Sequence, residues 1–421
     1  MKTRRMPYPR RPGYRTPLAA WLTATLALAM AACSSGASSS ATTARSASTT
    51  VATTTTSTTS DDRLPPVRHV FIIVLENEDY ADSFGDPAAD PYLATTLPSK
   101  GALLTEYYAI GHFSNDNYVA LVSGQAPNPD TQGDCLMYDD FPPTSTIEPD
   151  GLVTGSGCVY PADVPTIANQ LDSAGLTWKA YMQDMGDIPT RESAVCGHPV
   201  VGTADRTELA TPGDGYAARH DPFVYFHSII DDAARCDARV VPLGTTTGAL
   251  PASAPPGTTG LATDLRSVAT TPNYSFITPN LCNDGHDAPC VNQTASASAG
   301  TNIDAFLSTW VPLITHSPAF TKDGLLIVTF DEADSTGPTA DASACCNEQP
   351  GPAASLPGET GPGGGRIGTV LISPFIRSGT VSDVPYNHYS TLATIEDLFG
   401  LPKLGEAANT SSTFGHDVFN R

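Results

Sequence analysis

The sequence predicts an α/β fold, a three-layer α/β/α sandwich with a mostly parallel central sheet. Two observations predict this class. Continuous apolar runs of strand length recur from one end of the chain to the other, as is typical of parallel strands buried on both faces. Helical patterns lie between these runs, and alternating strands and helices indicate a sheet covered by helices on both faces. In such folds ligands bind beyond the carboxyl ends of the strands.

Four apolar runs are the predicted strands. They are HVFIIVL (69–75), NYSFITP (273–279), GLLIVTF (324–330) and GTVLISPF (368–375). The glycine-rich run 361–368 is not a phosphate-binding loop, because it lacks the Gly-Lys-Ser/Thr ending and precedes a strand rather than a helix. We interpret it as a flexible lead into the last strand.

Helical spacing of apolar residues marks the predicted helices. The segments are 118–124, 167–175, 306–313 and 390–400. Ser390 is expected to cap the last helix and Gly400 to end it. Gly124 and Gly175 are expected to end two of the others.

The N-terminal part of the chain has the features of an export signal. Residues 1–33 combine basic residues with an apolar run that is too short for a stable membrane span. Ala31-Ala32-Cys33 resembles a lipobox, which predicts a lipid on Cys33; simple secretion is the alternative. The Ser/Thr-rich segment 34–63 is expected to be a disordered tether. Residues 64–421 are expected to form a single domain, either held at the outer face of a membrane or secreted.

The chain is acidic. Cleavage after Ala32 would remove six basic and no acidic residues and take the formal net charge from −22 to −28. Such a charge is repelled by nucleic acid. The sequence has no basic run for anionic lipids, so we expect membrane contact through the lipid alone, and we expect a monomer.

Nine cysteines are present, and eight remain when Cys33 is set aside. An even number in an exported chain predicts disulfides. Proximity in the sequence favours the pairs 135 with 158, 196 with 236, 282 with 290, and 345 with 346. A zinc site is the competing interpretation, but no CxxC spacing supports it.

Polar residues follow three of the predicted strands. Glu76-Asn77 follows the first, the segment 283–287 (NDGHD) the second, and the segment 331–334 (DEAD) the third. Each segment alone is typical of a turn or a helix cap. Together they would repel one another at one edge of the sheet unless a cation lay among them, so this edge is the candidate active site.

The candidate nucleophile is Ser114, in the segment 109–124 (AIGHFSNDNYVALVSG). It would lie near a helix N-terminus, which favours an anion such as phosphate. A plain N-cap is the alternative. His388, just before the last helix, and the loop pair Arg219-His220 are candidate groups for binding phosphate oxygens or protonating a leaving group.

With these residues assembled, the chain resembles the phosphoesterase family of bacterial acid phosphatases and phospholipases C, within the alkaline-phosphatase-like superfamily. It is most similar to the mycobacterial-type secreted acid phosphatases. The matching stretches run in order over about 70–403 and are HVFIIVLENEDY, HFSNDNYVALVSG, WKAYMQDM, ARHDPFVYF, ITPNLCNDGHD, IVTFDEAD and NHYSTLATIEDLFGLPKLG.

The resemblance implies an alkaline-phosphatase-like fold and a role for each site residue. Glu76, Asn77, Asp331 and Glu332 would hold a divalent metal, with Ser114 as both ligand and nucleophile. Asn117 would touch a phosphate oxygen. The other implied residues, which line the phosphate or complete a second metal position, are His220, His286, His388 and Asp284. Oxygen ligands suit Ca²⁺, Mg²⁺ or Mn²⁺, and the histidines would favour Zn²⁺ or iron.

The implied reaction is hydrolysis of a phosphate monoester through a phosphoserine on Ser114. A phospholipase C or other phosphodiesterase activity is the first alternative, and a non-catalytic metal-binding surface lipoprotein is the second. The substrate would be a small phosphate ester or a phospholipid-derived one. The sequence departs from the family's HPSxPNY pattern at Phe113 and Asp116, which replace two prolines. Asp116 is expected to place a negative charge beside the incoming phosphate.

Overall fold

The computed structural model describes residues 63–421 except 292, 295–297 and 337–339. The predicted signal segment 1–33 and, apart from residue 63, the predicted tether 34–63 lie outside the described residues. The chain from Thr59 to Arg421 forms one compact unit. None of the helices in this described part combines the length and the apolar character that a bilayer crossing requires.

The centre of the fold is an eight-stranded sheet with the order β11-β2-β10-β9-β1-β8-β5-β7. Its strands are β1 (His69–Leu75), β2 (Ala102–Leu104), β5 (Trp178–Met182), β7 (Val240–Pro242), β8 (Tyr274–Thr278), β9 (Gly324–Phe330), β10 (Thr369–Ile372) and β11 (Thr380–Ser382). Every pair is parallel except those that β10 makes with β2 and β9. The predicted mostly parallel sheet and its four predicted strands are therefore confirmed.

Strand β10 runs against its neighbours because of the connection before it. The segment 331–368 leaves β9 at its carboxyl end and reaches β10 without a crossover helix among its described residues. A parallel strand would need such a crossover. The glycine-rich run 361–368 leads into β10, as the sequence predicts. Two small sheets lie outside the main one; they pair β3 (Tyr107–Tyr108) with β12 (Tyr386–Asn387) and β4 (Met137–Tyr138) with β6 (Thr203–Ala204).

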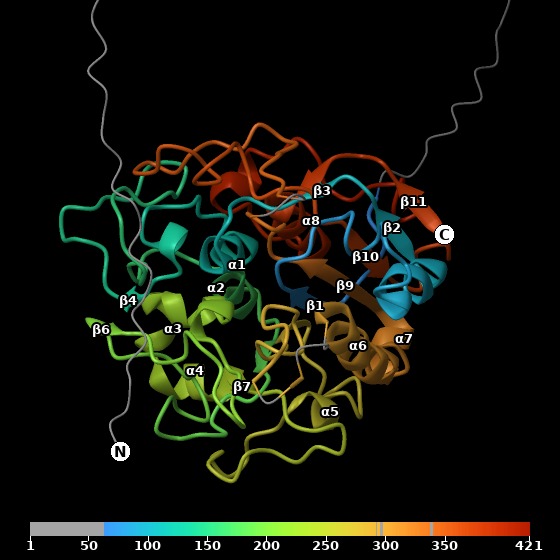
Figure 1. Ribbon diagram of the computed structural model, residues 1–421, viewed down its shortest axis with the longest axis horizontal. Coiled ribbons are helices and arrows are strands. Elements are labelled where there is room, and N and C mark those ends of the chain that lie inside the picture. The colour runs from blue at the N-terminus through green and yellow to red at the C-terminus, as the bar shows by residue number, and fades with distance from the viewer. Residues whose placement is uncertain (1–62, 292, 295–297, 337–339) are drawn as a thin grey trace, which may run out of the picture. The chain divides into compact units, whose positions relative to one another are not determined.

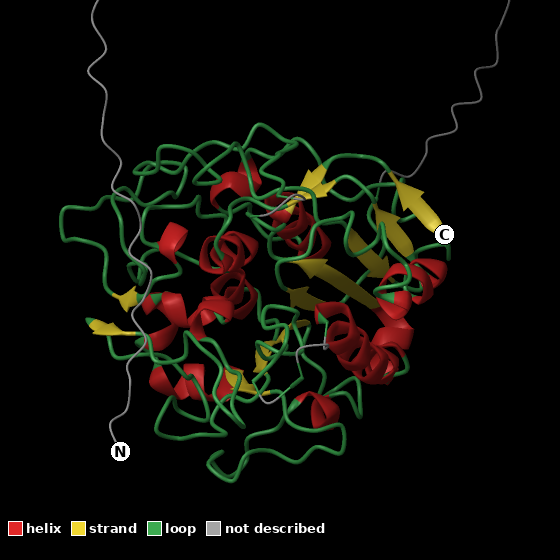
Figure 2. Cartoon of the chain, in the orientation of Figure 1, coloured by secondary structure: helices red, strands yellow, loops and turns green. Residues whose placement is uncertain are grey.

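Helices cover both faces of the main sheet (Figures 1 and 2). They are α1 (Ser114–Ser123), α2 (Ile167–Ser173), α3 (His227–Ile230), α4 (Ala233–Arg239), α5 (Leu261–Asp264), α6 (Ala299–Thr315), α7 (Pro318–Asp323) and α8 (His388–Phe399). Short 3₁₀ or π turns lie at Tyr92–Thr96, Pro98–Lys100, Thr131–Gly133, Ala218–His220, Pro222–Tyr225 and Gly405–Ala408. The ring of Tyr118 on α1 packs against Phe276 on β8, and that of Phe320 on α7 packs against Phe71 on β1. Phe71 and Phe276 point to opposite faces, since the residue paired with Phe276 is Ile72.

Helices α1 and α6 begin earlier than predicted, at Ser114 and Ala299, and one predicted cap differs. Helix α1 ends at Gly124 with a φ of 70°, as expected, because the left-handed conformation suits glycine. Helix α8 begins earlier than predicted, and its cap is Asn387 rather than Ser390. The Asn387 side chain accepts the backbone N–H of Ser390, and the Ser390 hydroxyl completes the capping box. His388 is therefore the first helical residue.

Two of the strands that lead into the candidate site, β1 and β9, are buried along their whole length. All seven residues of β1 and all seven of β9 are buried, and β1 is paired on both sides. Burying one large apolar side chain contributes roughly 1.5–3 kcal/mol, so the apolar runs anchor both strands firmly. The residues that follow them are held at fixed positions as a result.

The four predicted disulfides are confirmed. They join Cys135 to Cys158, Cys196 to Cys236, Cys282 to Cys290 and Cys345 to Cys346.

Replacing both Cys282 and Cys290 with serine should lower the free energy of unfolding by about 2–3 kcal/mol, because the crosslink closes a loop in the unfolded chain. The matched control replaces Cys345 and Cys346, which enclose almost no loop and should cost about 1 kcal/mol or less. Urea unfolding of both variants measures the difference. Equal losses would show that loop closure is not the source of the stabilisation.

Candidate active site

The candidate site lies at the carboxyl edge of the sheet, where β1, β8 and β9 end. Backbone hydrogen bonds hold the three strand ends together: Glu76 N donates to Asp284 O at 2.9 Å, and Asp331 N donates to Leu75 O at 2.9 Å. The backbone N–H of Asn77 donates to Asp331 Oδ1 at 3.1 Å. Asn77 has a φ of 56°, which turns the chain sharply after β1. The predicted convergence of these segments is therefore observed.

Ser114 lies beside this edge as the first residue of α1. Its hydroxyl donates to Glu76 Oε2 at 2.9 Å, and the Tyr118 hydroxyl donates to Glu76 Oε1 at 2.6 Å. The cap of α1 is Phe113, which makes no side-chain bond to the helix. Ser114 is thus aimed at the carboxylate of Glu76 rather than used as an N-cap.

Three buried side chains form a compact donor set next to Ser114. One ligand atom each from Glu76, His220 and Asp284 lies within 4.8 Å of the other two. His220 Nε2 is 3.4 Å from Glu76 Oε1, and its Nδ1 is 3.3 Å from Asp284 Oδ2. Three buried atoms have no hydrogen-bond partner among the residues that the structure describes: His220 Nε2, Asp284 Oδ2 and Asp331 Oδ2. Buried oxygen and imidazole donors left without partners fit a divalent cation.

Burial and like charge also make the carboxylates unstable as anions. Burial first, and then Asp331 and Asp284, raise the pKa of Glu76 well above its ordinary value. Burial raises the pKa of Asp284 in the same direction, and that of Asp331 to about 6. Such groups bind either protons or a cation.

Glu332, which follows Asp331 in the chain, and Asn117 lie outside the three-residue donor set. Burial, followed by the charge of Asp331, raises the pKa of Glu332. Glu332 Oε2 is 3.4 Å from Asn117 Nδ2. The rest of the Asn117 amide binds backbone: its oxygen accepts the N–H groups of Ile110 and Gly111, and its nitrogen donates to Gly111 O. Asn117 therefore holds the loop in front of Ser114 in place.

The ring of His388 binds other groups of the protein through both nitrogens. Its Nε2 lies 2.6 Å from the backbone oxygen of Asp331, and its Nδ1 lies 3.2 Å from the Tyr107 hydroxyl. Burial lowers the pKa of His388 to about 4. The geometry thus makes His388 a neutral support for the turn that carries Asp331.

Arg219, which is buried, and His286, which is partly exposed, lie beside His220. A guanidinium nitrogen of Arg219 is 2.9 Å from His286 Nε2, and another is 3.3 Å from a Glu208 carboxylate oxygen. His286 Nδ1 lies 2.8 Å from Asp287 Oδ1. The charge of Arg219 is therefore shared with Glu208 and, at 3.9 Å, with Asp134.

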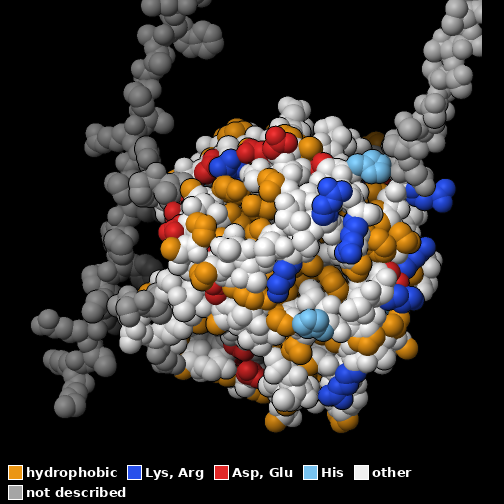
Figure 3. Space-filling view, turned by 90° about the vertical axis from the view of Figure 1, so that its right-hand side faces the viewer, with side chains coloured by type: hydrophobic (Ala, Val, Ile, Leu, Met, Phe, Trp, Pro, Cys, Tyr) orange, Lys and Arg blue, Asp and Glu red, His pale blue; other side chains and the backbone are white. Residues whose placement is uncertain are grey.

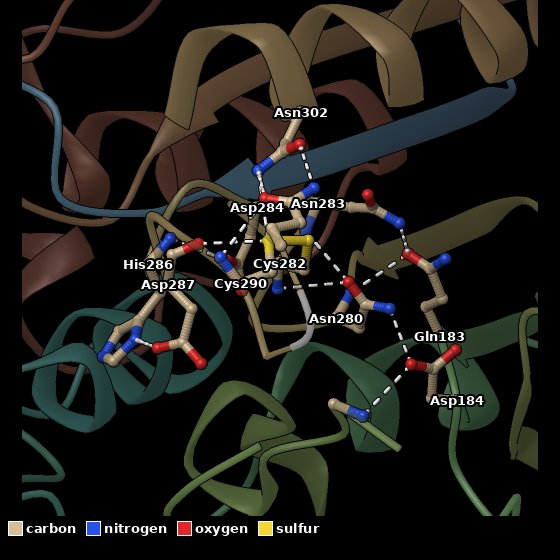
Figure 4. The surroundings of a disulfide bond; sticks show 12 residues. Gln183, Asp184, Asn280, Cys282, Asn283, Asp284, His286, Asp287, Cys290 and Asn302 are labelled. Carbon is tan, nitrogen blue, oxygen red and sulfur yellow. Dashed lines mark hydrogen bonds and ion pairs between the residues drawn. A yellow bond between two sulfur atoms is a disulfide. The ribbon is translucent and has the colours of Figure 1, made fainter. Parts of the chain in front are cut away.

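The loop that carries Asp284 and His286 is held by the disulfide between Cys282 and Cys290 and by a network of amide hydrogen bonds (Figure 4). Asn280 Oδ1 accepts the backbone N–H groups of Cys282 and Asn283, while its Nδ2 donates to Asp184 at 2.6 Å. His286 N donates to Asp284 Oδ1 at 2.9 Å. The loop residues thus keep their orientation relative to β8.

Asp116 differs from the expectation of a negative charge next to the phosphate. Its carboxyl group is buried and lies against Gly111. Burial, followed by the charges of Asp134 and Asp331, raises the pKa of Asp116 well above its ordinary value. The protonated, neutral form is favoured, so the expected repulsion is reduced.

Two residues of the site were not singled out from the sequence. Tyr118 lies four residues after Ser114, so helical spacing could have placed both on the same face toward Glu76. Asp134, which accepts the backbone N–H of Asn115 at 3.1 Å, has no local signal, because it is brought in by the loop that Cys135 crosslinks.

Comparison with known proteins finds one matching family and several related phosphatases. The model of the phosphoesterase family matches residues 87–402. The phosphate-repressible acid phosphatase of Penicillium chrysogenum is 30% identical over 336 residues, 79% of this chain and 59% of that protein. The phosphatidylinositol-3-phosphatase of Mycobacterium tuberculosis is 27% identical, over 82% of this chain and 81% of that protein. The chain thus spans about three fifths of its first curated relative.

Among solved structures, a protein in the alkaline phosphatase superfamily from Vibrio parahaemolyticus is 15% identical, with a TM-score of 0.47 over 84% of this chain and 72% of that one.

Proposed function

This chain belongs to the phosphoesterase family, and from that premise we propose that it hydrolyses phosphate monoesters with Ser114 as nucleophile. The observation that carries the proposal is the hydrogen bond from the Ser114 hydroxyl to Glu76 at the edge where buried carboxylates meet. The named acid phosphatases among its relatives support the same class of substrate.

The proposed reaction starts with attack of Ser114 Oγ on phosphorus. The hydroxyl proton passes to Glu76 Oε2, to which it is already hydrogen-bonded, and the ester oxygen leaves in line with the new bond. Water then cleaves the phosphoserine and releases phosphate. The N-terminus of α1 favours the phosphate charge. A divalent cation held by Glu76, Asp284, His220 and Asp331 would lower the hydroxyl pKa and offset charge in the transition state.

The leaving oxygen needs a proton donor. Burial, together with Arg219 and His286, lowers the pKa of His220, and burial lowers that of His388, so neither is a protonated acid near neutral pH. The side chain of His286 is 27% exposed and bonds to Asp287. A guanidinium nitrogen can only donate, so His286 Nε2 accepts from Arg219 and has no proton for the leaving group, while its Nδ1 faces Asp287. We therefore propose that solvent water protonates the leaving oxygen.

The test is a matched pair of nitrophenyl monoester and diester substrates assayed between pH 4 and 9. We expect kcat/KM for the monoester to be at least about tenfold higher, because a dianion would gain more than a monoanion from a divalent cation and from the N-terminus of α1. The mycobacterial relative is named for a lipid monoester, which fits the same preference. A diester preference would indicate a phospholipase C type of activity. No turnover of either substrate would favour a non-catalytic metal-binding role.

We also propose that the protein is exported and held to a membrane through a lipid on Cys33. The apolar run that ends in Ala-Ala-Cys supports this. The Cys33→Ser variant should move from the membrane fraction to the soluble fraction when cells are fractionated. Unchanged membrane partitioning of this variant would contradict the lipid anchor.

A further inference from the structure

The fold gathers cations that are far apart in the sequence at the amino edge of the sheet. Arg68, Lys100, Lys322 and Arg377 stand one to three residues before β1, β2, β9 and β11. These four strands point the same way, so their amino ends share one edge. The sequence shows no basic run because each cation precedes a different strand. The absence of a basic run along the sequence therefore does not exclude a basic face in the fold.

These cations are exposed and available. Within the described part of the chain, Arg68, Lys100 and Arg377 form no ion pair, and Lys322 pairs with Asp323 at 3.6 Å. Arg63 and Arg421 extend the same face, since Arg421 N donates to Phe375 O and Arg377 N donates to Asn420 Oδ1. Figure 3 shows the side of the molecule that carries β2, β11 and the C-terminus; Lys and Arg side chains lie across its centre and right, and most acidic ones lie toward its top and lower-left edges. We name Arg63, Arg68, Lys100, Lys322, Arg377 and Arg421 the amino-edge face.

A hollow with apolar walls opens within this face. Its volume is about 540 Å³, and its lining combines Arg63 and Arg421 with apolar residues that include Leu64, Phe375 and Phe419. Cations around an apolar floor match a bilayer surface, where phosphate groups lie above hydrocarbon.

The acidity of the whole chain does not oppose this match. The carboxylates of the candidate site lie at the other end of the strands, and seven residues of β1 span about 23 Å at 3.3 Å per residue. The Debye length is about 10 Å at 0.1 M salt. An anionic surface against the amino-edge face would therefore respond to the cations nearby rather than to the net charge.

We propose that the amino-edge face docks on an anionic lipid bilayer. The described chain begins at Arg63 within this face, so the segment 34–63 leaves from it. If this segment is the tether that the sequence predicts, its length would correspond to roughly 30 Å on average and would keep a lipid-anchored protein within reach of the surface. The candidate site then faces away from the membrane. The proposal does not depend on the activity proposed for that site.

The experiment uses the chain from Ser34 to Arg421, which carries no lipid and contains the whole compact unit. Sedimentation with vesicles measures binding to phosphatidylcholine alone and to an equal mixture with phosphatidylglycerol, at 20 mM and 500 mM salt. We expect binding only to the anionic vesicles at low salt. The variant R68Q/K100Q/R377Q should bind at least about tenfold more weakly, since each cation near an anionic surface contributes.

The matched control is R206Q/R235Q/K403Q, which changes the net charge equally but leaves the amino-edge face intact. It should bind like the parent, and nitrophenyl phosphate turnover should be the same in all three proteins. Equal binding to both kinds of vesicle, or equal losses in the two variants, would overturn the proposal. Binding to soluble polyphosphate without retention on anionic vesicles would also overturn it and assign the face to a polymer.

Discussion

Replacing Ser114 with alanine should reduce kcat/KM for a nitrophenyl phosphate monoester by at least about a thousandfold, because the attacking oxygen is lost. The fold should survive, since the side chain is small and its hydroxyl bonds to a single described residue, Glu76. The loss should appear in kcat more than in KM, because the chemical step itself is removed.

Ser123→Ala is the matched control for this result. Ser123 lies at the far end of the same helix, where its hydroxyl donates to Val119 O. Activity in this variant should stay close to that of the parent. If Ser114→Ala kept full activity, the phosphoserine mechanism would be excluded. Trapping of a phosphorylated peptide that contains Ser114 after an acid quench would support it directly.

The sequence predicted the strand ends well because strand formation there depends on short runs of neighbouring apolar residues. Seven apolar residues in each of β1 and β9 require burial on both faces, and the parallel arrangement then brings Glu76 and Asp331 to one edge. Cysteine proximity likewise predicted all four disulfides. Such features depend on short stretches of the chain.

Other features depend on contacts between distant segments and could not be predicted. The direction of β10 follows from a connection with no crossover, and Arg219 shares its charge with Glu208 and Asp134 only after three loops meet. The roles of His388 and Asn117 follow from what each side chain contacts. Family resemblance placed both residues at the site. Only the geometry shows that the His388 ring and the Asn117 amide bind backbone groups.

Replacing Asp331 with asparagine should remove bound metal and activity together. The amide keeps an oxygen to accept the N–H groups of Asn77 and Glu332, so the turn should remain in place while the charge is lost. We expect kcat/KM to fall at least about a hundredfold, in step with metal content measured by elemental analysis. Asp334→Asn, on the same loop, is the control and should retain both. Full activity in exhaustively chelated protein would contradict a metal requirement.

The same site should bind metal more weakly in acid. Burial raises the pKa of Asp331 to about 6 and shifts Glu76 and Asp284 in the same direction, so protons compete with a cation for these oxygens. Below pH 6 the metal concentration that gives half-maximal activity should rise by about tenfold per pH unit for each proton displaced. At pH values above the raised pKa values, the metal concentration that gives half-maximal activity should no longer change with pH. Metal titrations of the chelated enzyme at pH 5, 6 and 7, with circular dichroism to verify folding, measure this slope. A requirement that is independent of pH would show that these carboxylates are not the ligands.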